Sequence, residues 1–365
     1  FLPSTGGAVG ERNDVTLVGL NHKMGNRGTT NTLLAFGDGS HSPAGQTGAV
    51  GYLVGEEHQG LSYMFHMMNE ARIGVGFLAT ALGYVGYRTS LKYAKERTQG
   101  RPAGSAAPDS APTPIIEHAD VRRMLMAQKS YAEGALALGL YCSRLVDQRD
   151  SVGDPAESAR ATLLLDILTP IAKSWPAQWC LEANSLAIQV HGGYGYSREY
   201  DVEQYYRDNR LNPIHEGTHG IQGLDLLGRK VTRDDGAGLD LLGQTIAATI
   251  TKGRTLGGDT DRYATELERV WTRIVQVTAT LWSAGDVETT LANSSVYLEA
   301  VGHTVIAWIW LEQVIAAEAR DGDFYDGKRQ AARYFYTYEL PKVTPQLDLL
   351  SALDRTTLDM NPNWF

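Results

Sequence analysis

The spacing of apolar residues changes near residue 61, and this change determines the fold class. Beyond residue 61 apolar residues recur every three or four positions, as in the run from Met64 through Ile73 to Val85, which is the spacing of one face of an α-helix. Before residue 57 the apolar runs are short and are separated by glycine-containing turns, a pattern typical of β-strands. The sequence therefore predicts a mainly α protein with a small β portion.

The β portion is expected to belong to a larger sheet. Strands are predicted at residues 15–20, 32–36 and 49–54. Three strands of this length bury too little apolar surface to be stable alone. Residues 1–57 are therefore interpreted as a partial β domain.

The helices are predicted in two groups. The first group comprises residues 61–97, 120–147, 155–173 and 176–191, with a Pro/Ala-rich loop at 101–117. Four successive long helices favour an antiparallel four-helix bundle, to which we assign residues 58–231. A polar linker at 232–238 precedes the second group, and residues 232–365 are interpreted as an additional C-terminal helical domain. Its helices are predicted at residues 239–252, 260–284, 287–318 and 328–353.

Charge and cysteine content argue against several classes of protein. With 33 basic and 42 acidic residues the chain has a net charge of −9, which argues against binding of bare nucleic acid or an anionic membrane surface. A few local arginines can still hold a small anionic ligand. The two cysteines, Cys142 and Cys180, lie in apolar helical stretches, so neither a disulfide framework nor a thiolate metal site is expected. A reducing, cytoplasmic location is the corresponding expectation.

Neither a targeting segment nor a membrane span is expected. The chain begins Phe1-Leu2-Pro3, without an initiator methionine, a basic region or an apolar leader. The longest apolar run, residues 296–317, contains Glu299, His303 and Glu312. This run is interpreted as a buried helix.

Gly192 and Gly193 directly follow the predicted helix that contains Gln189. A turn without side chains lets backbone N–H groups approach an anion such as a pyrophosphate. Glycine is also the residue that most often ends a helix, and this structural role is favoured when the turn is considered alone. The spacing is not that of a Rossmann fingerprint, because no strand precedes the turn.

Glu216 and two arginines are further candidates for a site. Glu216 precedes Gly217, so it can be a base exposed where a substrate approaches the backbone, or a carboxylate that complements a helix start. Taken alone, the structural role is favoured. Arg72 lies in a helix segment rich in small residues, where a ligand can come close. Its alternative, which is the commoner case, is a surface arginine paired with Glu70 or a neighbouring acid. Arg97 ends a helix, where a cation is stabilising even without a ligand.

Residues 215–219 formally match the H-E-x-x-H pattern of zinc proteases. That pattern requires a continuous helix, which places both imidazoles on one face. Pro213 just upstream and Gly217 within the segment weaken such a helix. No metal site is therefore expected.

The order of these segments resembles the acyl-CoA dehydrogenase family. The resemblance covers roughly residues 10–231, and its most distinctive part is the glycine turn followed by R-D-x-x-x-x-x-I-x-E-G-T at residues 207–218. The helical extension at 239–365 is similar to the larger bacterial branch that includes 3-methylmercaptopropionyl-CoA dehydrogenase-like enzymes. The other segments that carry the resemblance are residues 22–28, 51–56, 72 and 93–97.

The resemblance implies a flavoenzyme that dehydrogenates an acyl-CoA thioester between its α and β carbons. Glu216 would be the base that removes the α-proton, while the β-hydrogen leaves as hydride to FAD. Gly217 would leave room for the thioester, and Arg72 would lie near the glutamate and the CoA path. Electron-transfer flavoprotein would then accept the electrons.

The resemblance also implies which residues hold FAD. Thr218 would contact the flavin, and Gln189, Gly192 and Gly193 would approach its adenine-pyrophosphate portion across a subunit interface. Arg97 would contact that dinucleotide from the partner subunit. These roles require at least a homodimer.

One departure from the family lies at the start of the chain. The family normally has an N-terminal helical domain and a complete middle β domain, of which residues 1–57 would be the C-terminal part. Phe1-Leu2-Pro3 looks like the interior of a sheet domain, so a longer or split protein is expected, and this chain alone is expected to hold FAD poorly. Two alternatives stay open: a non-catalytic helical subunit of a heteromeric dehydrogenase, and an acyl-CoA oxidase.

Overall fold

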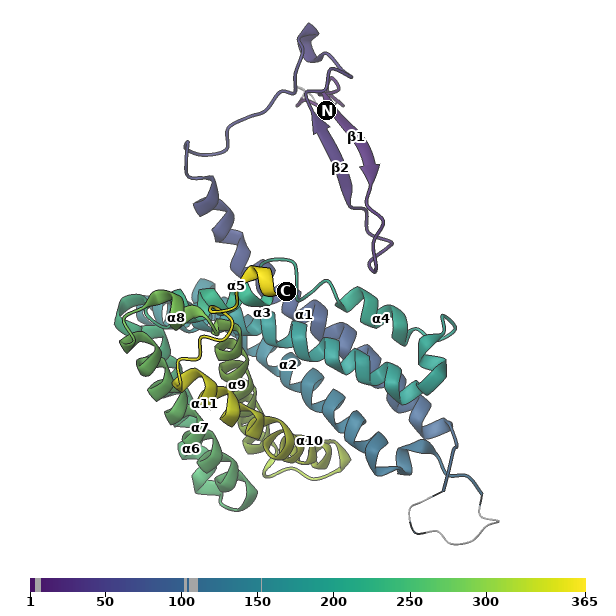
Figure 1. The fold of residues 1–365 in the computed structure, drawn as a ribbon, viewed down its shortest axis with the longest axis vertical. Helices are drawn as coiled ribbons and strands as arrows, with labels where there is room; N and C mark the ends of the chain where they lie inside the picture. Colours follow the sequence, from purple (N-terminus) through teal and green to yellow (C-terminus); the bar gives the residue numbers. More distant parts are fainter. Residues whose placement is uncertain (4–7, 102–103, 105–110, 152) are drawn as a thin grey trace. The chain divides into compact units, whose positions relative to one another are not determined.

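The chain divides into two compact units, residues 1–68 and residues 69–365. The computed structural model describes residues 1–3, 8–101, 104, 111–151 and 153–365. Within the loop predicted at 101–117, residues 102–103 and 105–110 lie outside the described residues. The mainly α fold with a small β portion is confirmed (Figure 1).

The first unit contains an antiparallel pair of strands, β1 (Val15–Leu20) and β2 (Thr32–Phe36). The successive residues Leu33 and Leu34 of β2 point to opposite faces of the strand, yet their side chains are 58% and 44% exposed. Apolar side chains on both faces of the pair are thus left uncovered, as expected for a partial sheet.

The third predicted strand, at 49–54, is wrong. That segment forms no strand, and its backbone is bound by a side chain instead. The N–H of Val50 donates to Asn13 Oδ1, and Asn13 Nδ2 donates to the carbonyl of Val50, both at 2.8 Å. The side-chain amide of Asn13 thus satisfies both the N–H and the carbonyl of Val50, so the backbone of Val50 needs no hydrogen bonds from a neighbouring strand.

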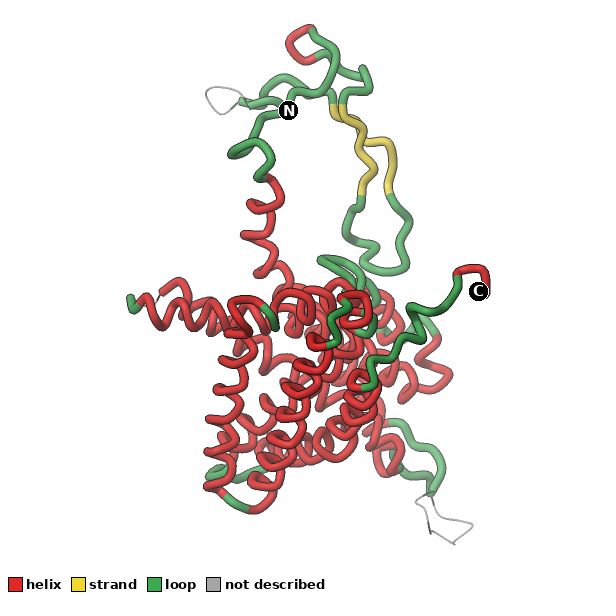
Figure 2. The backbone as a smooth tube through the Cα atoms, turned by 60° about the vertical axis from the view of Figure 1, so that its left-hand side comes forward, coloured by secondary structure: helices red, strands yellow, loops and turns green. Residues whose placement is uncertain are grey.

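The second unit is helical (Figure 2). Three long helices lead into it: α1 (Gly60–Glu96), α2 (Ala119–Ser151) and α3 (Pro155–His191). The remaining helices are α4 (Val202–Asn209), α5 (His219–Asp225), α6 (Ala237–Leu256), α7 (Gly258–Ser283), α8 (Val287–Leu291), α9 (Ser294–Ala317), α10 (Asp323–Tyr334) and α11 (Val343–Ser351). A π-helical turn follows α5 at Leu226–Lys230, and another follows α10 at Phe335–Glu339.

The predicted break between residues 173 and 176 is wrong, because α3 continues through Pro170 and Pro176. A proline has no N–H, so Pro176 leaves the carbonyl of Ala172 without its helical donor. The helix persists because this stretch is buried, with Ile171 and Ala177 at 0% exposure. The predicted helix 287–318 is divided between α8 and α9, and the predicted helix 328–353 is divided around Pro341.

Helix α1 packs closely on α3 at this proline pair. A Cβ placed on Gly76 of α1 would lie 2.0 Å from the carbonyl oxygen of Ala172, and one on Gly83 would lie 2.6 Å from Cβ of Cys180. Only glycine allows the two backbones to approach so closely.

One continuous apolar core joins both helical regions. It contains residues of α2, α3, α6, α7 and α9 to α11, and Figure 1 shows these helices gathered together. Helix α9 is long and apolar enough to cross a membrane, but 78% of its apolar window is buried within the protein. The predicted buried helix is thus confirmed. The domain boundary proposed near residue 231 lies inside this unit and stays a prediction.

We predict that Gly76→Ala destabilises the chain by about 1–3 kcal/mol, because the added methyl group overlaps a backbone carbonyl of α3. The free energy of unfolding in urea measures this. Gly74→Ala, in the same helix, is the control: its Cβ would meet nothing within 4 Å, so it should stabilise by about 0.5–1 kcal/mol. Equal effects of the two substitutions would contradict the close packing.

Candidate functional site

Glu216 lies on a sharp turn that leads into α5. Its φ is +54° and that of Gly217 is +90°, so two successive residues adopt the left-handed conformation. For a residue other than glycine this costs roughly 1–2 kcal/mol. Thr218 then caps α5, its hydroxyl accepting a hydrogen bond from the N–H of Ile221. The helix-start role considered for Glu216 therefore belongs to Thr218, and Glu216 itself lies on the turn.

The backbone of this turn is held by two buried side chains. Lys173 Nζ donates to the carbonyl of Gly217 at 2.7 Å and to that of Asn212 at 2.9 Å. Gln222 Nε2 donates to the carbonyl of Glu216 at 2.9 Å. Both side chains are fully buried. The turn is therefore fixed through its carbonyl oxygens by groups from α3 and α5.

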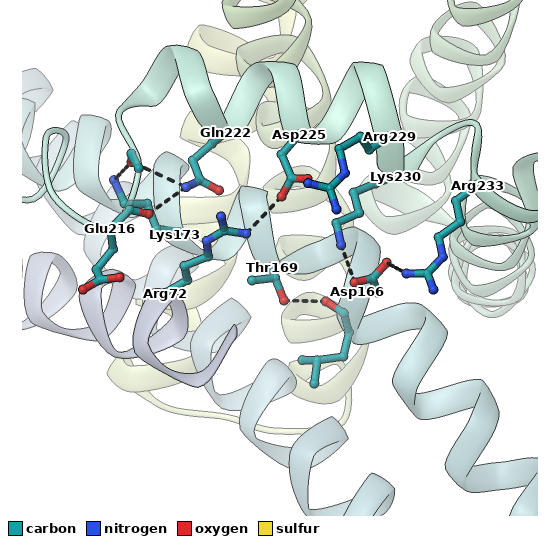
Figure 3. Close-up of polar contacts among 12 residues, drawn as sticks. Arg72, Asp166, Thr169, Lys173, Glu216, Gln222, Asp225, Arg229, Lys230 and Arg233 are labelled. Carbon is teal, nitrogen blue, oxygen red and sulfur yellow. Dashed lines mark hydrogen bonds and ion pairs between the residues drawn. The ribbon is translucent and has the colours of Figure 1, made fainter. Parts of the chain in front are cut away.

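The carboxylate of Glu216 is half-buried and points away from Gln222 and Asp225 (Figure 3). Among the residues that the structure describes, none forms a hydrogen bond or ion pair with this carboxylate, and none accepts a hydrogen bond from the Glu216 N–H. Both groups are thus available to a ligand.

Arg72 reaches the same cluster from α1. It is 6% exposed, and its guanidinium is 3.0 Å from Asp225 Oδ2. The predicted surface pair with Glu70 is wrong, because Glu70 pairs with Arg149 instead. Arg72 Nε has no hydrogen-bond partner among the described residues, and neither has the buried Gln222 Oε1. Buried polar atoms without partners are costly, so these two atoms point to a bound ligand or water.

Burial and nearby charges shift the pKa values of this cluster. Burial, reinforced by the Arg72 cation, lowers the pKa of Lys173 to about 8, while the Glu216 carboxylate opposes this shift. Burial also lowers the pKa of His215 and of His219, with Lys173 contributing in each case. The two imidazoles are consequently neutral at pH 7.

The H-E-x-x-H segment does not have the geometry of a zinc site. Helix α5 begins only at His219, so His215 lies outside it, and His215 Nε2 is 3.0 Å from Asn212 Oδ1. Within the described ranges no three His, Cys, Asp or Glu side chains are placed to hold a metal. Burial raises the pKa of Cys142 and of Cys180 to about 12, which leaves both as protonated thiols.

A second site lies where α1 and α3 end. Arg97, Gln189, Gly192 and Gly193 line one cavity of about 760 Å³, within the size range of small-molecule sites. Gly192 caps α3 with φ +62° and donates its N–H to the Gln189 carbonyl, so the predicted helix-ending role is confirmed. A Cβ on Gly192 or Gly193 would meet no atom within 4 Å, so the turn is open to a ligand.

The other walls of this cavity combine aromatic and polar groups. Tyr93 stacks on His191 with 4.3 Å between ring centroids, and burial lowers the pKa of His191. Arg97 is exposed, and its guanidinium donates to the carbonyl of Thr98 and to the side chain of Gln99. A cation, an amide and an open glycine turn form a donor set suited to a dinucleotide.

The predicted site residues thus fall into two groups. Arg72, Glu216, Gly217 and Thr218 lie around the turn before α5, while the other four line the cavity. Sequence reasoning missed Lys173, whose only signal is a single lysine in an apolar helical run between two prolines. It also missed the roles of Gln222 and Asp225.

Comparison with known proteins identifies relatives of both helical regions. Residues 58–231 match the family model "Acyl-CoA dehydrogenase, C-terminal domain", and residues 242–361 match "Acetyl-CoA dehydrogenase C-terminal like". The 3-methylmercaptopropionyl-CoA dehydrogenase of Ruegeria pomeroyi is 34% identical over 349 residues, which cover 92% of this chain and 56% of that protein. A broad-specificity linear acyl-CoA dehydrogenase of Mycobacterium tuberculosis is 33% identical over 374 residues, which cover 97% of this chain and 60% of that protein.

A solved structure shares the fold. Caenorhabditis elegans ACDH-11 in complex with C11-CoA superposes with a TM-score of 0.72 at 15% identity, covering 94% of this chain and 55% of that one. The chain therefore spans between 55% and 60% of the length of these three proteins.

We predict that Arg72→Met destabilises the chain by about 3–5 kcal/mol, because it leaves Asp225 buried without its main partner. The double variant Arg72→Met/Asp225→Leu should recover most of this loss, since both charges are then removed. Urea unfolding of the two variants tests this. Arg149→Met is the control: its partners Glu70 and Asp150 are more than half exposed, so it should cost at most about 1 kcal/mol. A double variant as unstable as the single one would contradict the interpretation.

Proposed function

Because the chain belongs to the acyl-CoA dehydrogenase family, we propose that it provides the base for α,β-dehydrogenation of an acyl-CoA thioester, with FAD as cofactor. The observation that carries this proposal is the Glu216 turn. Its carboxylate is half-buried and without a partner among the described residues, on a strained backbone held by buried side chains. A conformation that costs free energy persists where the surrounding structure enforces it, and such positions cluster at active sites.

The chemistry requires the groups that this turn offers. The α-proton of a thioester is very weakly acidic, so its removal needs a fixed carboxylate together with hydrogen-bond donors to the thioester oxygen. In the proposed arrangement Glu216 accepts the α-proton, and its own N–H, free of an acceptor among the described residues, donates to that oxygen. Gly217 has φ +90°, and a Cβ there would lie 2.5 Å from Gln222 Nε2, so its lack of a side chain makes room for Gln222 rather than for the thioester.

Bound FAD would supply the acceptor for the β-hydrogen, which leaves the substrate as hydride and gives the α,β-unsaturated thioester. Thr218, beside the base, would face the flavin. The cavity at the end of α3 suits an adenine-pyrophosphate portion, held by Arg97, Gln189 and the open turn at Gly192 and Gly193.

We extend the proposal to the partners of this chain. The cavity residues would serve the FAD of a second copy, which makes the protein at least a homodimer. Electron-transfer flavoprotein would reoxidise the reduced flavin, and the location would be cytoplasmic. Arg72, beside Glu216 in the cluster, would border the path of CoA.

We predict that Glu216→Gln lowers the rate of flavin bleaching by acyl-CoA at least about 100-fold, because the amide cannot accept the α-proton. Anaerobic stopped-flow absorbance of the complete, FAD-loaded protein measures this rate. Glu268→Gln is the matched control, since Glu268 pairs with Arg254 on the exposed surface and its substitution should leave the rate unchanged. Bleaching of the Glu216→Gln protein at the normal rate would refute the assignment of the base.

A further inference from the structure

Lys173 is a buried cation that the proposed reaction does not use. Its side chain is fully buried, and its ammonium donates to two carbonyls, those of Asn212 and Gly217. These two residues flank the four that form the turn, residues 213–216. One ammonium group therefore closes the turn at both ends.

The turn also contains backbone hydrogen bonds, such as those from the N–H groups of His215 and His219, but among the described residues only one other side chain binds the carbonyls of Glu216 and Gly217. Gln222 Nε2 binds the carbonyl of Glu216 at 2.9 Å and approaches that of Gly217 at 3.4 Å. Without Lys173, the buried carbonyl of Asn212 would lose its donor, and that of Gly217 would keep only the longer contact. Since Glu216 and Gly217 both have left-handed backbone conformations, the turn needs such contacts to keep its shape.

The contacts of Lys173 continue into a chain of buried amides. Asn212 Nδ2 donates to Asn209 Oδ1 at 2.8 Å, and Asn209 Nδ2 donates to Asn184 Oδ1 at 2.6 Å. Asn184 Nδ2 in turn donates to the carbonyl of Leu82 in α1. The turn is thereby connected to α3 and α1, which approach each other closely at Gly76 and Gly83.

The titratable groups around Lys173 come from three elements. Arg72 faces it from α1, His215 and Glu216 from the turn, and His219 from α5. Of these only Glu216 is anionic, and it is near enough for its charge to be felt at Lys173. The ammonium thus contributes a positive charge next to the turn as well as two hydrogen bonds.

We propose that Lys173 is a positioning residue, whose protonated ammonium fixes the backbone of the Glu216 turn and so aims the carboxylate at the substrate. This proposal rests on the proposed function of Glu216. In this proposal the charge state of Lys173 determines the position of the Glu216 carboxylate, although Lys173 itself does not contact the reacting atoms.

The lowered pKa of Lys173, about 8, makes the proposal testable by pH. Above this pH the ammonium becomes an amine, which binds carbonyls more weakly, so the turn should loosen and the rate should fall. The fold itself should not weaken through this group: a lysine whose pKa is lowered by folding makes the folded state more stable as pH rises from about 8 to 10.5. A loss of rate at pH 9 without unfolding is therefore the expected signature.

The first experiment is hydrogen exchange of the unmodified chain at pH 7 and pH 9.5, corrected for intrinsic exchange. The reporters are the N–H groups of His215 and His219, which donate to the carbonyls of Leu211 and Pro213. We expect their protection to fall at least tenfold between the two pH values, while that of α9 is unchanged. Unchanged protection of the turn would overturn the proposal, whatever the activity of the protein.

The second experiment compares Lys173→Met and Lys173→Arg in the complete, FAD-loaded protein. Lys173→Met should lower the bleaching rate at least about tenfold at pH 7, as misplacing a reacting group does, and should abolish the fall in rate above pH 8. Lys173→Arg keeps a permanent cation, so it should retain more activity than Lys173→Met. Its rate should likewise no longer fall above pH 8. Lys230→Met is the control, because it removes a buried lysine paired with Asp166. The bleaching rate of this variant should still fall above pH 8.

The outcomes separate this proposal from the function of Glu216. If Glu216→Gln bleaches normally, the base assignment fails. If Glu216→Gln is inactive but Lys173→Met keeps the wild-type pH profile, the role of Lys173 is refuted and the proposed function stands. Failure of a Lys173 variant to fold leaves the exchange measurement on the unmodified chain to decide.

Discussion

The structure depends on α3 remaining helical through two prolines. Pro176 removes a helical hydrogen bond, and Gly76 of α1 lies directly against the carbonyl thus left without a donor. Because the helix is continuous, its direction is preserved from Lys173 beside the Glu216 turn to Gly192 at the cavity. At 1.5 Å per residue these two positions are about 28 Å apart. One rigid element therefore positions both candidate sites, and a break at the prolines would leave their separation undefined.

Local sequence patterns predicted most of the helices, because amphipathic spacing and end signals are properties of neighbouring residues. They failed where a distant part of the molecule decides the outcome. Burial keeps α3 helical at Pro170 and Pro176, and the side chain of Asn13 replaces a strand partner for Val50. In each case the local rule describes the conformational preference of the segment correctly, but tertiary contacts override that preference.

The candidate site shows the same division. Motif order identified Glu216, Gly217 and Thr218, and the structure gives local reasons for two of them: the positive φ of Gly217 and the helix cap formed by Thr218. The residues that hold the turn were not predictable in this way. Lys173 binds a carbonyl 44 positions away, and Arg72 pairs with Asp225 153 positions away. Neither separation leaves a signal in a single sequence.

Two cations, Arg72 and Lys173, lie near the carboxylate of Glu216, the proposed base. Arg72 and Lys173 supply two positive charges, and Asp225 and Glu216 supply two negative ones. In the proposed reaction, transfer of the α-proton to Glu216 neutralises its carboxylate while negative charge develops on the thioester oxygen. Until the β-hydrogen leaves as hydride, the number of charges in the cluster is thus unchanged, and the second cation keeps an anionic partner for that part of the reaction. A buried charge left without a partner is costly, so the two cations favour the enolate-like state over a site in which Glu216 is protonated and nothing replaces its charge.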